Sequence, residues 1–368
     1  MNSLGRTAIA ALATAVLLQW GSAAATTTAG GFTEATAPYT FSFPRDHAAH
    51  DGYRTEWWYF TGHLRAGDGH RFGYELTFFR IGIAPHATHM RPGESRWHGT
   101  QLYPAHFAIT DERSGRFVYY EDFARDALAQ GRASPRRLDV RVHDWTLRGP
   151  MPFSLHASKG GDGIDLAVNS RKPPAIHGVG GISRKGACRS CASHYYSYTR
   201  LATTGRIRVQ NHEYGVRGIS WMDHEYGSDE LQGDQIGWDW FSMQLNDGRE
   251  VMLYRLRQRD GSTTPQSSGS LIARSGSVRF LPLRAFTIRA TEHWISPHTT
   301  ARYPSAWTVH VDGVGDLIIT PQIADQELVN ASNGVTYWEG SVAIRSPNGK
   351  PLGVGYVELT GYAQPVNL

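Results

Sequence analysis

The chain has only two cysteines, Cys188 and Cys191, among its 368 residues. A zinc knuckle needs a second ligand pair, which the nearby His194 alone does not supply. A thioredoxin-like redox site needs a βαβ context that the neighbouring residues do not show. We therefore expect a local disulfide in an oxidising compartment, with two reduced thiols as the alternative.

Long apolar runs are also scarce. The longest, from Thr7 to Leu18, is followed by small residues at Ser22 to Ala25, and it is shorter than the roughly 18 residues that cross a bilayer. This pattern indicates a secretory signal peptide over residues 1–25. We expect a soluble mature protein without a transmembrane segment, located in the periplasm or secreted.

Clusters of one charge and common catalytic motifs are missing as well. The net charge is only +4, and the basic residues are scattered, which argues against nucleic acid as a partner. No zincin motif, G-x-S-x-G elbow or phosphate loop occurs. We therefore expect neither acyl-serine nor nucleotide chemistry, and we predict no metal site.

Alternation of apolar and polar residues dominates what remains. Segments such as "RFGYELTFFRIGI" and "AWTVHVDGVGDLIITP" have the period of two that is typical of strands, and Asp-Gly or Asn-Gly turns separate them. The 40 glycines fit many turns. The sequence predicts an all-β protein.

An internal repeat indicates two similar halves. "WWYFTGHL" from Trp57 returns as "WDWFSMQL" from Trp238, and "GISWMD" at residues 218–223 resembles "GVGYVE" at residues 353–358. So long a period predicts duplicated domains, which could each be a closed antiparallel β-barrel, with chance similarity between Trp-rich strands as the alternative. Closing each barrel would pair its first and last strands around an aromatic calyx.

The stretch "GISWMDHEYG" offers the best candidate for chemistry. In a strand, Trp221, Asp223 and Glu225 share one face, and His224 lies on the other. Burial beside an indole would raise the pKa of the Asp223 carboxyl and make it a general acid. The alternative is that Asp223 caps a turn or pairs with an arginine.

A second candidate is "ASHYYSYTRL", in which His194 and Tyr196 share a face. His194 could activate a water molecule, and the ring of Tyr196 could stabilise a cation. Both also suit an ordinary half-buried strand.

These two stretches, together with "FPRDHAAHDGYRTEWWYFTGHL", "GWDWFSMQLNDG" and "GYVELTGYA", resemble the AttH/CrtC family, whose lipocalin-like members include carotenoid 1,2-hydratases. The resemblance runs from about Phe43 to Ala363. It implies paired lipocalin-like barrels and hydration of an alkene without a cofactor. Carried over by position, the catalytic set is His194, Tyr196, Trp221 and Asp223.

We therefore predict barrels over residues 40–230 and 231–365, and an exported hydratase or lyase that protonates an alkene of a hydrophobic polyene or terpenoid. The alternative is a periplasmic carrier that binds a lipophilic ligand without catalysis. The predicted pocket residues are Trp57, Tyr59, Glu225, Trp238 and Trp240. The ligand's identity and the oligomeric state are left open.

Overall fold

The computed structural model describes residues 26–85, 99–126, 130–228, 231–329 and 335–366. The predicted signal peptide, residues 1–25, lies outside the described residues. No helix in these ranges is long and apolar enough to span a membrane.

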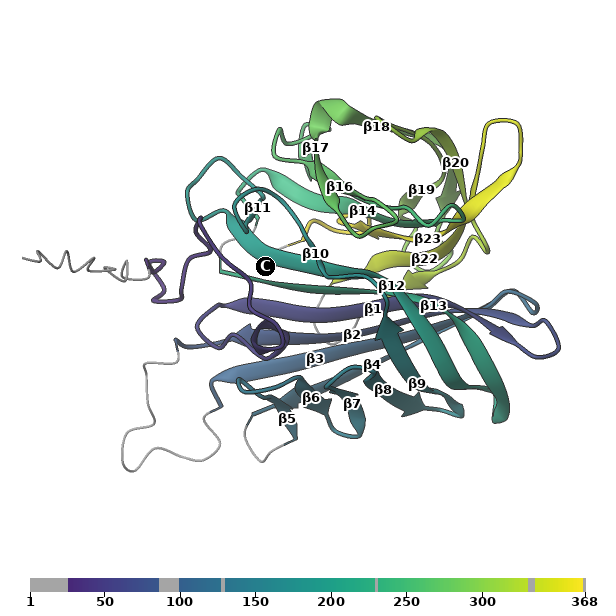
Figure 1. Cartoon of the computed structure of the whole chain (residues 1–368), viewed down its shortest axis with the longest axis horizontal. Coiled ribbons are helices and arrows are strands. Elements are labelled where there is room, and N and C mark those ends of the chain that lie inside the picture. The colour runs from purple at the N-terminus through teal and green to yellow at the C-terminus, as the bar shows by residue number, and fades with distance from the viewer. Residues whose placement is uncertain (1–25, 86–98, 127–129, 229–230, 330–334, 367–368) are drawn as a thin grey trace, which may run out of the picture.

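The protein is all-β, as the alternating sequence predicted. Its two antiparallel sheets form one nearly closed barrel and one half-barrel (Figure 1). Within the described residues, the short 3-10 helices η1 (Arg45–His47) and η3 (Leu283–Ala285) accompany the strands.

The first sheet has the strand order β4-β3-β2-β1-β13-β12-β9-β8-β7-β6-β5, with β10 and β11 attached to β12. Its edge strands β4 and β5 lie against each other. The strands are β1 (Thr55–Ala66), β2 (Arg71–Gly82), β3 (Gln101–Asp111), β4 (Arg116–Arg125), β5 (Gly131–Ala133), β6 (Asp139–Val142), β7 (Trp145–Arg148), β8 (Phe153–Lys159), β9 (Asp162–Ser170), β10 (Ala175–Ile176), β11 (Ser183–Arg184), β12 (Ala192–Val209) and β13 (His212–Gly227).

The second sheet has the strand order β17-β16-β15-β14-β23-β22-β20-β19-β18, with β21 attached to β22. Helix η3 contacts both edge strands, β17 and β18. The strands are β14 (Gln235–Leu245), β15 (Glu250–Gln258), β16 (Ser268–Ile272), β17 (Val278–Pro282), β18 (Phe286–Ile295), β19 (Arg302–Val311), β20 (Gly315–Pro321), β21 (Glu327–Leu328), β22 (Tyr337–Arg345) and β23 (Pro351–Thr360).

In both sheets the first strand pairs with the last, which confirms the pairing predicted from the repeat. Strand β1 pairs with β13, so that Tyr59 lies opposite Asp223. Strand β14 pairs with β23, so that Trp240 lies opposite Glu358. The repeat therefore places an aromatic ring beside a carboxyl at equivalent positions of the two sheets.

Strand alternation divides the side chains among three cores. Trp58, Phe60 and Met222 belong to the core enclosed by the first sheet, and Phe241 belongs to that of the second. A third, aromatic cluster contains residues of both sheets that point away from these two cores. Because neighbouring residues of a strand face opposite sides, each central strand packs one face into the core of its own sheet and the other face against the neighbouring sheet.

The sheets approach each other closely enough to require glycine at one position. A Cβ atom on Gly73 of β2 would lie 2.4 Å from the Tyr356 hydroxyl of β23 and 2.9 Å from Cβ of Ser341 on β22. A side chain there would force the strands apart. The two sheets are therefore in close contact near Gly73. Farther along the strands, aromatic side chains surround the space that remains between the sheets.

Candidate functional site

A cavity of about 370 Å³ lies between the two sheets. We expected an aromatic calyx inside a barrel, and the position of this cavity corrects that expectation. Trp58, Phe60 and Tyr74 are fully buried in the core that the first sheet encloses. The cavity instead uses the opposite faces of the same strands, because the second sheet covers them.

The residues predicted to form a ligand pocket all line this cavity. They come from β1, β13 and β14, and are Trp57, Tyr59, Glu225, Trp238 and Trp240. Asp223 lines it too. The wall also includes residues that the sequence did not single out: Thr77, Phe79, His106, Lys185, Tyr195, Tyr254, Tyr337, Glu339 and Glu358.

Asp223 is almost completely buried, at 4% exposure, and three neutral groups donate hydrogen bonds to it. The Tyr195 hydroxyl and the Trp221 indole Nε1 each lie 2.6 Å from its carboxylate oxygens, and the Ser197 hydroxyl is the third donor. Burial raises the pKa of Asp223 to about 7, although these bonds oppose the rise. The carboxyl is therefore partly protonated at neutral pH.

The alternative roles considered for Asp223 do not match its surroundings. The residue lies within β13 rather than at a turn. Among the residues that the structure describes, no lysine or arginine forms an ion pair with it. The charge of Glu225 raises the pKa of Asp223 further.

A hydrogen-bonded layer behind Asp223 holds the acid in place. His177 Nε2 lies 2.6 Å from the Ser197 hydroxyl, and burial lowers the pKa of His177 to about 3, so its imidazole is neutral. From the second sheet, Trp240 Nε1 donates to the Tyr195 hydroxyl at 3.0 Å. Trp221 also belongs to this supporting layer, since it contacts Asp223 without lining the cavity.

His194 and Tyr196 lie on the opposite face of β12 from Tyr195. The register pairs Tyr196 with His224 and Ser197 with Asp223. Tyr196 accordingly contacts His47 and His224, at 2.6 and 3.0 Å, on the barrel side of the sheet. The structure therefore brings Trp221 to Asp223 but does not bring His194 and Tyr196 to it.

The local position of His194 is that of a packed side chain. Its Nδ1 donates to the Gly181 carbonyl at 2.9 Å, and its ring stacks on Tyr39 with centroids 3.8 Å apart. Burial lowers the pKa of His194 to about 4.

Tyr195 and Ser197, which the sequence interpretation missed, could have been found by aligning β12 with β13, because they share the cavity face with Asp223.

The wall formed by the second sheet carries its own carboxyls. Glu339 and Glu358 lie opposite each other on β22 and β23. Burial raises the pKa of Glu339 well above its usual range and that of Glu358 to about 8, and the charges of neighbouring carboxyls add to both shifts. The sequence indicated Glu358 through the internal repeat, in which it occupies the position equivalent to Asp223.

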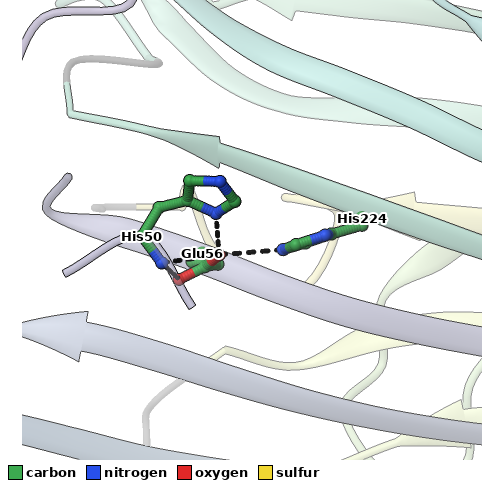
Figure 2. A group of neighbouring side chains, drawn as sticks. All are labelled: His50, Glu56 and His224. Atoms are coloured by element: carbon green, nitrogen blue, oxygen red, sulfur yellow. Dashed lines mark hydrogen bonds and ion pairs between the residues drawn. The ribbon is translucent and has the colours of Figure 1, made fainter. Parts of the chain in front are cut away.

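A different buried carboxyl, Glu56, lies on the barrel side of β1 (Figure 2). His50 Nδ1 and His224 Nε2 both lie 2.8 Å from its Oε1 atom. These three residues are the one group of potential metal ligands within the described part of the chain. However, Arg80 Nε bonds the second carboxylate oxygen at 2.7 Å, so the group already forms a neutralised ion-pair network.

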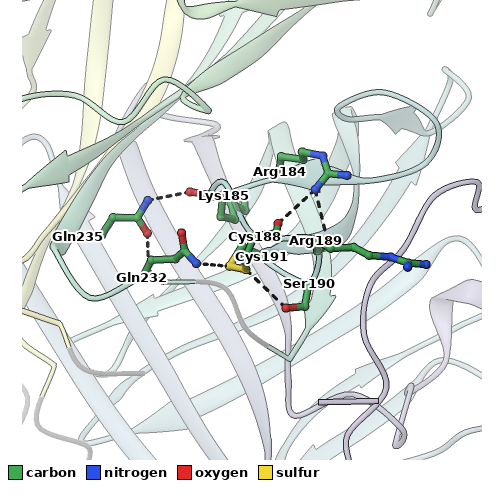
Figure 3. Close-up of a disulfide and its surroundings, with 8 residues drawn as sticks. All are labelled: Arg184, Lys185, Cys188, Arg189, Ser190, Cys191, Gln232 and Gln235. Atoms are coloured by element: carbon green, nitrogen blue, oxygen red, sulfur yellow. Dashed lines mark hydrogen bonds between the residues drawn. A yellow bond between two sulfur atoms is a disulfide. The ribbon is translucent and has the colours of Figure 1, made fainter. Parts of the chain in front are cut away.

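A loop that contains the disulfide between Cys188 and Cys191 (Figure 3) follows Lys185, which lines the cavity. Gln232 Nε2 contacts Cys191 Sγ at 2.6 Å, and Gln235 Nε2 donates to the Lys185 carbonyl at 2.7 Å. These contacts tie the loop to the start of the second sheet.

Lys185, which precedes this loop, turns its side chain toward the cavity. Its ammonium group pairs with Glu225 at 2.7 Å and lies 4.3 Å from the centre of the Tyr254 ring. Glu225 therefore has a cationic partner, whereas Asp223, two residues away on the same face, has only neutral donors.

A family model described as AttH-like matches residues 34–362. A crystal structure of a candidate AttH protein from Nitrosomonas europaea is 33% identical, with a TM-score of 0.78, over 88% of this chain and 98% of that one. Kievitone hydratase from Nectria haematococca is 15% identical, with a TM-score of 0.65, over 90% and 96% of the two chains. CghA with Sch210972 is 10% identical, with a TM-score of 0.50, over 84% and 88%. No curated protein sequence matches the chain.

Proposed function

Because the chain belongs to the AttH-like family, we propose that it is a hydratase-like enzyme that binds an unsaturated hydrophobic molecule between its two sheets. The reaction is protonation of a carbon–carbon double bond followed by addition of water. Kievitone hydratase shares the fold, which supports this class of chemistry. The substrate class we favour is a polyene or terpenoid, because the cavity wall is rich in aromatic side chains.

The observation that carries this proposal is the burial of Asp223 on the cavity wall, where only neutral groups donate hydrogen bonds to it. Its pKa of about 7 lets the same group give up a proton and recover it near neutral pH. Asp223 would transfer its proton to the less substituted alkene carbon and leave a carbocation on the more substituted one. The oxygen of water then bonds to the cation, and the released proton returns to the Asp223 carboxylate, which balances the reaction.

The aromatic wall suits the intermediate in this sequence. Ring faces stabilise a cation through their quadrupole without forming a bond to it. Trp57, Tyr59, Trp238 and Trp240 surround the cavity, and the Tyr59 hydroxyl is held by Glu339 at 2.7 Å. The rings would therefore protect the cation until water adds.

We also propose that the mature protein is exported to the periplasm or secreted. The apolar segment before residue 25 supports this location, as does the disulfide between Cys188 and Cys191, because such bonds persist in oxidising compartments. Sequencing the N-terminus of protein recovered from the periplasm or medium should give a start near Thr26. An intact Met1 in that material would contradict the proposal.

The test of the enzymatic function is the Asp223→Asn variant, with farnesol as an acyclic prenyl substrate. This substitution keeps the shape and removes the proton donor, so turnover should fall by roughly two orders of magnitude or more. Binding should change little. Asp165→Asn is a matched control, because Asp165 is an exposed carboxyl of the same sheet, at 43% side-chain exposure.

The outcomes separate an enzyme from the alternative, a carrier. Equal turnover by wild type and Asp223→Asn would remove Asp223 from the mechanism. Tight farnesol binding without turnover in either protein would favour a carrier that uses the same cavity.

A further inference from the structure

The cavity has a polar feature that protonation of an alkene does not use. Glu339 of the second sheet is only 1% exposed and lines the same cavity as Asp223. One of its oxygens accepts a hydrogen bond from the Tyr59 hydroxyl at 2.7 Å, but the other, Oε2, is buried without a hydrogen-bond partner. A buried polar atom in this state costs stability unless something else satisfies it.

Two neighbouring carboxyls extend this polar area. Glu358 lies directly opposite Glu339 on the adjacent strand and is partly open to the cavity. Glu75 of β2 is 1% exposed, accepts a hydrogen bond from the cavity residue Thr77, and also has an unpartnered Oε2 atom. Among the described residues, no lysine or arginine forms an ion pair with any of these three carboxyls.

The protonation of these groups determines what they can bind. The charges of Glu75 and Glu358 oppose ionisation of Glu339, and burial raises the pKa values of all three carboxyls. A protonated carboxyl offers both a donor and an acceptor. An anionic ligand group would be repelled by any of these acids that ionises, whereas a neutral hydroxyl or carbonyl oxygen could pair with them.

We propose that Glu339 and Glu358 form an oxygen-binding subsite, so that the substrate is an unsaturated apolar molecule carrying a hydroxyl or carbonyl group rather than a pure hydrocarbon. This inference rests on the proposed use of the cavity between the sheets. A hydrocarbon would displace water from the cavity and leave the Glu339 Oε2 atom unsatisfied. An oxygenated ligand would satisfy it and be held with its other end toward Asp223.

The test compares the binding of farnesol and farnesene, a C15 alcohol and a C15 hydrocarbon with similar apolar chains. Quenching of tryptophan fluorescence reports binding, because Trp57, Trp238 and Trp240 line the cavity. Wild type should bind farnesol roughly tenfold more tightly than farnesene. Glu339→Met should lose most of this preference, and its affinity for farnesene should stay the same or rise.

Glu292→Met is the matched control, because it makes the same substitution at an exposed position of the second sheet, and it should keep the wild-type preference. If Glu339→Met does not fold, Glu358→Met replaces it with the same expected loss of preference. An unchanged preference in the folded variant would overturn the subsite. Binding of neither ligand by wild type would overturn the subsite and the ligand cavity together. A preference that depends on Glu339, found without any turnover, would support the subsite while the enzymatic proposal fails.

Discussion

Glu56 and Asp223 are buried carboxyls on the paired strands β1 and β13, yet their surroundings differ completely. Glu56 faces the barrel side, where the charge of Arg80 and the hydrogen bonds of His224 and His50 outweigh burial and hold its pKa well below the usual range. Asp223 faces the cavity, where only neutral groups donate to it and its pKa rises to about 7. Burial alone therefore does not keep a carboxyl protonated at neutral pH, because the presence of a counter-charge decides its protonation.

The two faces of the first sheet thus have different roles. The barrel side of β13 contributes His224 to the hydrogen-bonded network around Glu56 and Arg80, which stabilises the fold. The cavity side contributes Asp223 and Glu225 to a surface that a ligand can reach. Substitutions on one side should mainly change stability, and those on the other should mainly change activity.

Among substitutions that test this comparison, Arg80→Met should have the largest effect on the free energy of unfolding. Arg80 is completely buried, and its loss leaves the Glu56 carboxylate without its strongest cationic partner. Breaking a buried pair in this way costs about 3–5 kcal/mol of unfolding free energy, which denaturant titration would measure. Arg113→Met breaks an exposed pair with Asp68 and should lower the free energy of unfolding far less, because solvent screens such a pair. Equal losses in the two variants would mean that Glu56 does not depend on Arg80.

A somewhat smaller effect should appear in the pH dependence of stability. The pKa of Asp223 is higher in the folded protein than in the unfolded chain, so the folded state binds more protons between about pH 4 and 7. Wild type should therefore lose stability relative to Asp223→Asn as the pH rises through this window, by about 2–4 kcal/mol in total. Thermal unfolding of both proteins at several pH values would show this. A constant difference between them would contradict the raised pKa.

The smallest effects should distinguish the neighbouring tyrosines Tyr195 and Tyr196, which face opposite sides of β12. Tyr195→Phe removes a hydrogen bond to Asp223 and should lower turnover by roughly fivefold, because one neutral hydrogen bond contributes about 1 kcal/mol. Tyr196→Phe removes contacts with His47 and His224, and should cost about 1 kcal/mol of stability while leaving turnover per folded molecule unchanged. A loss of turnover in Tyr196→Phe would instead support its predicted catalytic role.

Much of this arrangement could be predicted locally. The alternation in "GISWMDHEYG" predicted a strand that presents Trp221, Asp223 and Glu225 on one face, and the structure has them so. The repeat predicted that β1 pairs with β13 and β14 with β23. Both predictions depend on short-range patterns, which the strand period and the need to pair sheet edges translate directly into structure.

The face of each strand that meets a neighbouring sheet could not be predicted from such local patterns. A period of two tells which residues share a face, but not which face meets a neighbouring sheet, and a shift of one residue reverses the assignment. The family resemblance implied that His194 and Tyr196 act with Asp223, although β12 turns them to the barrel side. The ambiguity between faces is why the cavity was expected inside a barrel.

The sequence by itself determined the strands, their duplication and an aspartate two positions after a tryptophan. Only the tertiary structure decided that the outer faces of two sheets cover each other, that Tyr195 and Ser197 hold Asp223, and that Glu339 faces the same space. The physical reason is that a carboxyl's protonation depends on lost water and on charges from other strands. For Asp223 they are burial and the hydrogen bonds of Ser197 and Tyr195 from the neighbouring strand β12, which only the folded chain brings together.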